Sequence, residues 1–214
     1  MDERLREACR RYVAAEFAPE DAVLEELRRE TADAGFPTIH IDAEEGRLLQ
    51  VLLRAIGARR VVELGTLGGY SAIWMARALP ADGRLTTVEL QPERAELARR
   101  YIARAGLSDR VDVLVGDALV LLEELADEGP FDAVFIDADK EGYPAYLDWC
   151  VSNVRRGGMV IADNAFKSGQ VLDASTEDSG VQGIQEFNRR IARDPKLTSI
   201  VVPTRDGVAI AVIN

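Results

Sequence analysis

The sequence is poor in the residues that build disulfides and thiolate or imidazole metal sites. Its 214 residues include only two cysteines, Cys9 and Cys150, and one histidine, His40. Two isolated cysteines in a chain without an export signal are more often free thiols than a disulfide or a metal site. The sequence also lacks an apolar run near the roughly 20 residues of a membrane span, and MDERLREACRRY at its start is too charged for a signal peptide. We expect a cytoplasmic protein that does not bind membranes.

Positive charge is scarce as well. Lysine and arginine number 26 against 37 aspartates and glutamates, which gives a formal net charge of −11 at pH 7. A negative surface repels phosphate backbones, so we expect no nucleic-acid partner. Hydrophobic residues make up 47% of the chain, which is ample for the core of one domain. We therefore expect a single domain over residues 1–214 that acts on a small molecule.

What the sequence does contain is a recurring pattern of short β-type runs. Two intervening stretches, 71–79 and 92–106, carry apolar residues at helical spacing, so crossover helices fit between the runs. Alternating strands and helices predict a parallel sheet covered on both faces. A short hairpin-like connection joins the last two runs, so the last strand is expected to be antiparallel. The runs span residues 59–65, 84–90, 110–116, 131–137, 157–163, 197–203 and 207–214.

The two ends of the chain differ from this repeating unit. Residues 3–16, 20–34 and 43–56 have helical patterns before the first strand. We expect a helical cap over residues 1–57, which covers the active edge of the sheet or a partner subunit, and a sheet core over residues 58–214. Residues 164–180 are rich in serine, aspartate and glycine and predict a loop over the site.

The turn after the first strand is the first candidate for ligand binding, because open parallel sheets bind ligands beyond the carboxyl ends of their strands. It reads ELGTLGGYS, and its glycines allow a ligand to approach the backbone. A tight turn with no ligand explains the glycines as well. The spacing is not G-x-G-x-x-G, so the dinucleotide fingerprint is missing. Glu63 would repel a pyrophosphate but favour a cationic ligand.

Acidic residues also follow the next two strands. Glu89 ends the second strand, roughly 20 residues beyond the glycine turn, where an acid can accept both hydroxyls of a ribose; the alternative is a solvated strand end. Asp117 follows the third strand and could bind an adenine amino group, cap the next helix, or do both. Three acidic strand ends with no basic residue among them suit a nucleoside with a positive charge. S-adenosylmethionine, a sulfonium with an amino group, is such a ligand.

The fourth and fifth strands end in a candidate metal site. Asp137 ends the fourth, and Asp163 and Asn164 end the fifth. Neighbouring strands lie about 4.8 Å apart, so these side chains would converge and the two carboxylates would repel each other. A hard divalent cation relieves that repulsion, and oxygen ligands suit Mg²⁺ first, with Ca²⁺ and Mn²⁺ as alternatives. Taken singly, Asp137 reads as a solvated strand end and Asp163 as a cap.

Lys140 follows Asp137 by three residues and is the candidate general base. A neighbouring metal ion favours a neutral amine, which can accept a proton from a substrate hydroxyl. The alternative is an ordinary salt bridge to Asp139 or Glu141. For Asp139 itself we expect a cap on the next helix or a pairing with a neighbour.

Four segments together resemble the cation-dependent, S-adenosylmethionine-dependent O-methyltransferases. They are VVELGTLGGYSAIWMA, GDAL, FIDADKEGY and ADN, and the resemblance extends from about Ile39 to RDGVAIAV near the C-terminus. The family is that of the caffeoyl-CoA O-methyltransferases and their bacterial relatives, and more distantly of catechol O-methyltransferase. The resemblance implies an α/β fold of the Rossmann-like class I methyltransferase type. Its sheet would have seven mostly parallel strands with an antiparallel last strand, and the protein would be a homodimer.

The resemblance also implies roles for individual residues. Asp137, Asp163 and Asn164 match the metal ligands, and Lys140 matches the catalytic lysine. The segment IHIDAEEG would place His40 near the site, although a packing role explains a lone histidine equally well. The implied cofactor-binding residues are His40, Ile41, Glu63, Gly65, Thr66, Gly69, Tyr70, Ser71, Glu89, Leu90, Asp117, Ala118, Asp137 and Tyr146.

The sequence departs from the family pattern where the acceptor would bind. After Asn164 the family often has a small residue, an aliphatic residue and a tryptophan, whereas this chain has Ala165, Phe166 and Lys167. The arginine and tyrosine of plant members are absent from GVQGIQEFN, which argues against a CoA thioester acceptor. The candidate acceptor residues are His40, Phe166 and Lys167, and Lys167 reads either as a partner for a carboxylate or as an exposed loop lysine. Aromatic residues that could form a wall are Tyr143, Tyr146, Trp149 and Phe166, although Tyr146 and Trp149, at helical spacing, are more often core residues.

The sequence therefore predicts a divalent-metal-dependent O-methyltransferase for a catechol-type aromatic acceptor. The metal would bind the acceptor hydroxyl and lower its pKa. Lys140 would accept the proton, and the oxygen would attack the sulfonium methyl in line. The alternatives are an NAD-dependent oxidoreductase on a similar sheet and a non-catalytic protein that binds S-adenosylmethionine. The acceptor, the position methylated, the metal and the oligomeric state are left open by the sequence.

Overall fold

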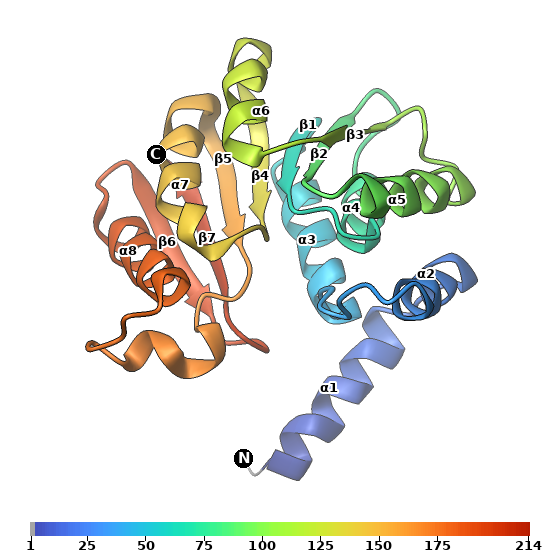
Figure 1. Ribbon diagram of the computed structural model, residues 1–214, viewed down its shortest axis with the longest axis horizontal. Helices are drawn as coiled ribbons and strands as arrows, with labels where there is room; N and C mark the ends of the chain where they lie inside the picture. Colours follow the sequence, from blue (N-terminus) through green and yellow to red (C-terminus); the bar gives the residue numbers. More distant parts are fainter. Residues whose placement is uncertain (1–2) are drawn as a thin grey trace.

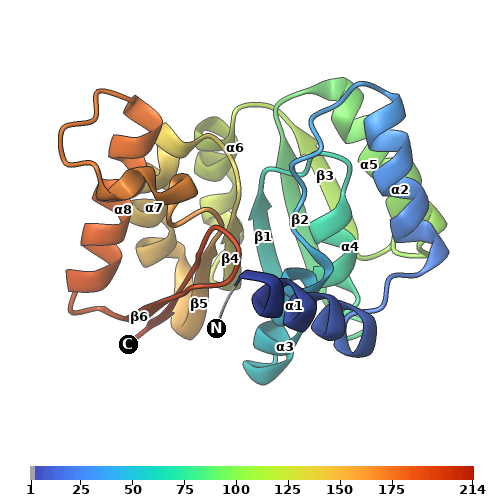
Figure 2. The ribbon, with the colours of Figure 1, turned by 90° about the horizontal axis from the view of Figure 1, so that it is seen from below.

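The computed structural model describes residues 3–214 and has a seven-stranded sheet between two layers of helices (Figures 1 and 2). The strand order is β3-β2-β1-β4-β5-β7-β6, with β1 to β5 parallel and β7 antiparallel to both of its neighbours. This confirms the expected mostly parallel sheet with an antiparallel last strand. The strands are β1 (Arg60–Leu64), β2 (Arg84–Glu89), β3 (Val111–Val115), β4 (Phe131–Ile136), β5 (Val154–Ala162), β6 (Leu197–Val202) and β7 (Val208–Ile213).

Helices precede the sheet and connect its strands. The α-helices are α1 (Glu3–Phe17), α2 (Ala22–Asp33), α3 (Ala43–Ala55), α4 (Tyr70–Ala76), α5 (Pro92–Arg104), α6 (Ala118–Leu125), α7 (Tyr143–Asn153) and α8 (Ser179–Arg193). Three short 3-10 turns are η1 (Ala126–Glu128), η2 (Lys140–Gly142) and η3 (Lys167–Leu172). The expected helices are therefore present, and the segment 164–180 is a loop that contains η3 and leads into α8.

Two predicted boundaries were wrong, each for a local reason. Strand β5 begins at Val154 rather than at Gly157, because Val154 pairs with Phe131 through an irregular register that the sequence does not reveal. Helix α4 ends at Ala76 rather than at residue 79. Leu79 precedes Pro80, and a residue before proline is disfavoured in the helical conformation, so the chain has already left the helix there.

Alternate residues of the central strands face opposite layers of helices. In β1, Val61 packs into the core with α2, α3, α4 and α5, whereas Val62 and Leu64 pack with α6, α7 and α8. Figure 2 shows α7 and α8 on one side of the strands and α2, α4 and α5 on the other. Both faces of the sheet are therefore buried, which explains the continuous apolar runs in its strands.

The N-terminal helices have different surroundings. Leu24 and Leu27 of α2 and Leu49 of α3 belong to the same core as the sheet. Helix α1 extends away from the body (Figure 1) and exposes Tyr12 and Phe17. No helix within residues 3–214 is long and apolar enough to cross a membrane. The homodimer and the division of the chain at residue 57 stay predictions.

Candidate active site

A cavity of about 940 Å³ opens at the carboxyl ends of β1, β2 and β4. It lies where β1 meets β4, the point from which the chain builds the sheet outward in both directions. Open α/β sheets bind ligands at such a switch point. Helix α2 and the turn between β6 and β7 complete the wall, so the N-terminal helices do cover the active edge. Of the predicted site residues, those that line the cavity are His40, Ile41, Gly65, Thr66, Tyr70, Ser71, Glu89, Leu90, Asp117, Ala118, Asp137, Lys140, Asn164 and Lys167.

Gly65 lets the turn after β1 lie directly against the end of β4. Its φ is +96°, and a Cβ at this position would lie 2.2 Å from the carbonyl oxygen of Asp137. The Asp137 amide donates to the carbonyl of Leu64 at 2.8 Å, which holds the two strand ends together. No side chain fits at Gly65, and this close approach brings the glycine turn and Asp137 into one cavity.

Glu63 lies behind the cavity wall and is fully buried. The hydroxyls of Ser71 and Thr87 each donate a hydrogen bond to its carboxylate, from Thr87 at 2.6 Å. Burial nevertheless raises the pKa of Glu63 to about 8, against the opposing effect of these two hydrogen bonds. Ser71 itself lines the cavity, so Glu63 reaches the ligand space through this hydroxyl. A cation that binds beside Ser71 would favour the ionised form of Glu63.

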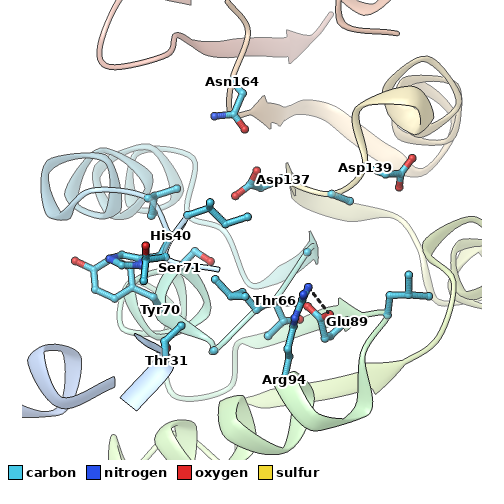
Figure 3. Close-up of a pocket in the computed structure, with 18 of the residues that line it drawn as sticks. Thr31, His40, Thr66, Tyr70, Ser71, Glu89, Arg94, Asp137, Asp139 and Asn164 are labelled. Carbon is cyan, nitrogen blue, oxygen red and sulfur yellow. Dashed lines mark hydrogen bonds and ion pairs between the residues drawn. The ribbon is translucent and has the colours of Figure 1, made fainter. Parts of the chain in front are cut away.

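Glu89 and Asp117 line the cavity at the ends of β2 and β3, on the side of β1 away from β4. Glu89 is buried, and its two oxygens accept hydrogen bonds from the amides of Leu67 at 2.8 Å and Gln91 at 3.0 Å. Arg94 approaches it to 3.9 Å (Figure 3). It is therefore not a solvated strand end. The Asp117 side chain caps α6 and also lines the cavity, so the capping interpretation is confirmed and is compatible with ligand binding.

The predicted metal ligands converge at one end of the cavity. Asp137 and Asn164 line it and face each other (Figure 3), while Asp163 is only 1% exposed and is not part of the cavity lining. The Asp163 amide donates to the carbonyl of Ile136 at 3.1 Å, which joins the end of β5 to that of β4. Asn164 takes a φ of +57°, a conformation that asparagine tolerates better than most residues.

The charges of this end fit a hard divalent cation. Burial raises the pKa of Asp137, against the effect of Lys140. Burial and then the charge of Asp137 raise the pKa of Asp163 to about 6. Within residues 3–214 no three side chains among Asp, Glu, His and Cys are grouped so that they could hold a metal ion. The candidate donors here are the carboxylates of Asp137 and Asp163 and the side-chain amide of Asn164. All three offer oxygen, the donor that Mg²⁺, Ca²⁺ and Mn²⁺ prefer.

Lys140 is held at the edge of this group by two partners. Its Nζ donates to Oδ1 of Asp137 at 2.9 Å and to the hydroxyl of Tyr143 at 2.7 Å. The interpretation that paired Lys140 with Asp139 or Glu141 was wrong, because η2 turns the side chain back toward the strand end. Helix α8 fixes the backbone: a Cβ at Gly183 would lie 2.2 Å from the Lys140 carbonyl oxygen.

Asp139 has a structural role, and Tyr146 acts with it. The Asp139 carboxylate caps η2 by accepting a hydrogen bond from the Gly142 amide at 2.9 Å, and it also accepts one from the Tyr146 hydroxyl. The capping interpretation of Asp139 is confirmed. Tyr146 is buried and lies outside the cavity lining, as do Glu63, Gly69 and Asp163.

The four aromatic residues that were expected to form a wall lie outside the cavity lining. Tyr143 is buried against Phe187, and the Trp149 indole nitrogen donates to the carbonyl of Leu122. Phe166 lies so close to Gly207 that a Cβ there would meet its ring at 2.7 Å. None of these four side chains lines the cavity, and the core interpretation is confirmed for Tyr146, while Trp149 is partly buried against the core.

His40 both packs and lines the cavity. Its ring centroid lies 5.1 Å from that of Tyr70, and both residues belong to the cavity wall. Burial, with the nearby charges of Arg28 and Arg205, lowers the pKa of His40. At neutral pH the ring is therefore expected to be uncharged, which suits contact with an aromatic or cationic ligand.

Several cations at the mouth of the cavity were missed from the sequence. Arg10, Arg28 and Arg205 come from α1, α2 and the turn between β6 and β7, and only the folded chain brings them together. Each contacts an acid: Arg10 bonds to Asp42, Arg28 to Glu20, and Arg205 approaches Asp42. The hairpin-like connection at residue 205 was recognisable, but its position over the cavity was not.

Comparison with known proteins agrees with this geometry. A model of the O-methyltransferase family matches residues 13–213. The chain is 38% identical to a catechol O-methyltransferase of Niastella koreensis, with all of both chains covered. It is 42% identical to a catechol O-methyltransferase of Mycobacterium tuberculosis, over 85% of this chain and 84% of that one. Among solved structures, the O-methyltransferase TomG of Streptomyces achromogenes, in complex with SAM (S-adenosylmethionine), matches with a TM-score of 0.94 and 36% identity over the whole of both chains.

Proposed function

The chain belongs to the O-methyltransferase family and is an S-adenosylmethionine-dependent enzyme, and on that premise we propose that it methylates a hydroxyl of a small catechol-type acceptor with the help of a divalent cation. The observation that carries this proposal is the meeting of Asp137, Asn164 and Lys140 at one end of the cavity, next to the buried Asp163. The opposite end carries Glu89 and Asp117. The cavity thus offers separate places for an acceptor and a nucleoside.

The cofactor site is assigned from the cavity wall. Glu89 is proposed to bind the ribose hydroxyls, because it is fixed at the end of β2 by two backbone amides. Asp117 and Ala118 would contact the adenine. Ser71, backed by Glu63, would meet the cationic end of S-adenosylmethionine. Gly65 lies between these residues and Asp137, and it must lack a side chain because a Cβ there would collide with the Asp137 carbonyl.

The cation site supports the chemistry of the acceptor. Asp137, Asp163 and Asn164 would hold a divalent cation, Mg²⁺ first among the candidates, whose Lewis acidity makes an acceptor hydroxyl more acidic. Asp137 and Tyr143 hold Lys140 at the border of this site, where its amine would accept the hydroxyl proton. The wall of the cavity then has only to keep the acceptor oxygen in line with the methyl group.

The two alternative functions lose their support. An NAD-dependent oxidoreductase would need a glycine fingerprint that the turn after β1 lacks, and the family match is to O-methyltransferases. A non-catalytic binding protein would have no use for Lys140 beside a pair of carboxylates. The relatives named as catechol O-methyltransferases support an acceptor with two adjacent hydroxyls.

Removal of divalent metal tests the proposal directly. Excess chelator is expected to lower methyl transfer to a catechol by at least about 100-fold, because a Lewis acid lowers the barrier by several kcal/mol. Added Mg²⁺ should restore the rate, as measured by methyl transfer from labelled S-adenosylmethionine. Cofactor affinity, measured by calorimetry in chelator, should stay unchanged. A rate that is the same in chelator and in Mg²⁺ would remove the cation from the proposed function.

We propose that the Lys167 amine binds the carboxylate of an acceptor and so favours acceptors that carry one. It lines the cavity near Asn164, and within residues 3–214 its amine has no acidic partner. Replacing Lys167 by methionine should raise the KM of a catechol carboxylic acid about tenfold, since a charge-assisted hydrogen bond is worth about 1.5 kcal/mol or more. The KM of unsubstituted catechol should not change. The matched control is Lys196→Met, at an exposed position before β6. Equal effects on both acceptors would contradict the assignment.

A further inference from the structure

Tyr143 is buried at the place where the ends of β4 and β5 meet. It begins α7, is 0% exposed, and packs edge-on against the ring of Phe187, with 5.4 Å between the ring centroids. Its hydroxyl lies 3.1 Å from the carbonyl oxygens of both Ile136 and Asp163. Ile136 is the last residue of β4, and Asp163 directly follows β5. The hydroxyl of Tyr143 therefore joins the two strand ends, and its ring has no room to swing away.

The neighbours of the Tyr143 hydroxyl decide the direction of each of its hydrogen bonds. A tyrosine hydroxyl has one proton to donate and can also accept. The carbonyl oxygens of Ile136 and Asp163 can only accept, so the proton of Tyr143 is committed to them. The Nζ atom of Lys140 lies 2.7 Å from the same hydroxyl and must therefore be the donor in that contact. Tyr143 is thus a fixed hydrogen-bond acceptor for the lysine amine.

The amine of Lys140 is oriented by two such hydrogen-bond acceptors. It donates to Oδ1 of Asp137 at 2.9 Å and to the Tyr143 hydroxyl at 2.7 Å. Apart from its bond to carbon, a lysine nitrogen has three tetrahedral directions, so one is left over. Lys140 lines the cavity whereas Tyr143 does not, so this third direction is available to a molecule in the cavity. It holds the lone pair in the neutral amine and an N–H in the ammonium, so one geometry serves before and after proton transfer.

We propose that Tyr143 is a positioning residue for the reaction, which directs the lone pair of the Lys140 amine at the hydroxyl of the methyl acceptor. The inference rests on the proposed role of Lys140 as general base. In the transfer, the O–H bond of the methyl acceptor breaks and an N–H bond forms at Lys140, while Tyr143 keeps its own proton. With Asp137 as the only hydrogen-bond acceptor, the lone pair could equally take the direction that faces Tyr143. The Tyr143 hydroxyl occupies that direction with an N–H and leaves the lone pair for the substrate.

Removing only the hydroxyl tests the inference. Tyr143→Phe keeps the ring against Phe187 and is expected to lower kcat for catechol about 10-fold, the usual value of one hydrogen bond to a charged or reacting group. The loss should be smaller than in Lys140→Met, because a misdirected amine still accepts a proton in some of its orientations. The KM of catechol and the affinity for S-adenosylhomocysteine, measured by calorimetry, should each stay within about twofold of wild type.

A double variant separates positioning from a purely structural role. If Tyr143 acts through the lysine amine, Tyr143→Phe should not slow the Lys140→Met enzyme further, because methionine has no amine to orient. If the hydroxyl only holds the ends of β4 and β5 together, its loss should slow Lys140→Met as much as it slows the wild type. The matched control is Tyr101→Phe. Tyr101 is a 2% exposed residue of α5 whose hydroxyl donates to Glu30 at 2.6 Å, away from the cavity, so kcat should not change.

Three results would overturn the inference. They are a kcat of Tyr143→Phe within about twofold of wild type, an equal loss in the wild-type and Lys140→Met backgrounds, and an equal loss in Tyr101→Phe. A Lys140→Met enzyme with wild-type turnover would instead refute the proposed general base, and the inference with it.

Discussion

Replacing Lys140 by methionine is expected to lower kcat for a catechol acceptor by about 10²- to 10⁴-fold, the usual contribution of a general base. Methionine keeps the length of the side chain, so the packing over the Tyr143 ring, 4.7 Å from the Lys140 amine, should survive. Cofactor affinity should change by less than about twofold, because the residues assigned to the ribose and adenine lie at the other end of the cavity. Single-turnover methyl transfer and calorimetry measure the two quantities separately.

A second variant distinguishes proton transfer from simple charge. Lys140→Arg keeps a cation beside Asp137, but arginine does not lose its proton in proteins. If Lys140 is the base, the arginine variant should be nearly as slow as the methionine variant. Turnover restored by arginine would show that Lys140 only neutralises Asp137. Turnover unaltered in both variants would remove Lys140 from the chemistry.

The strand ends were predictable because their chemistry follows from the topology. Buried parallel strands are continuous apolar runs, and such strands end along one edge of the sheet. Asp137 and Asn164 could therefore be placed together from their positions in the sequence alone, as the structure confirms. The same reasoning did not show that Asp163 is buried and lies outside the cavity lining. The depth of a side chain depends on how the two strand ends join, here through the amide of Asp163 and the carbonyl of Ile136.

The loops and the helical cap were less predictable, because their side chains are placed by backbone geometry and distant packing. Lys167 and Ser168 have φ values of +47° and +54°, and this left-handed turn directs Phe166 toward Gly207 while Lys167 lines the cavity. Hydrophobic periodicity carries no information about such a turn. Arg10 of α1 and Arg28 of α2 likewise have an ordinary helical setting, and only the folded chain brings them to the cavity.

The ligand-free protein is expected to lose stability between about pH 5 and pH 8 through Glu63. The pKa of Glu63 is about 8 in the folded protein and about 4.5 in an unfolded chain. Between these values the unfolded chain ionises while the folded protein retains the proton, so rising pH favours unfolding. The stabilisation is complete below about pH 4.5 and is lost as pH rises through 8. For a fully buried group it amounts to on the order of 4 kcal/mol.

Glu63→Gln should remove this part of the pH dependence of stability. It should also remove a pH dependence of cofactor affinity. A positively charged cofactor beside Ser71 favours the ionised carboxylate, so wild-type affinity for S-adenosylmethionine is expected to rise between pH 6 and pH 8. Glutamine cannot ionise, and its affinity should stay flat. Urea unfolding and calorimetry at both pH values give the two slopes, and the difference between wild type and variant cancels the titration of the other carboxyl groups. Glu25→Gln, on an exposed position of α2, is the matched control and should behave as the wild type. Equal slopes in wild type and Glu63→Gln would show that Glu63 neither titrates in this range nor responds to the cofactor's charge.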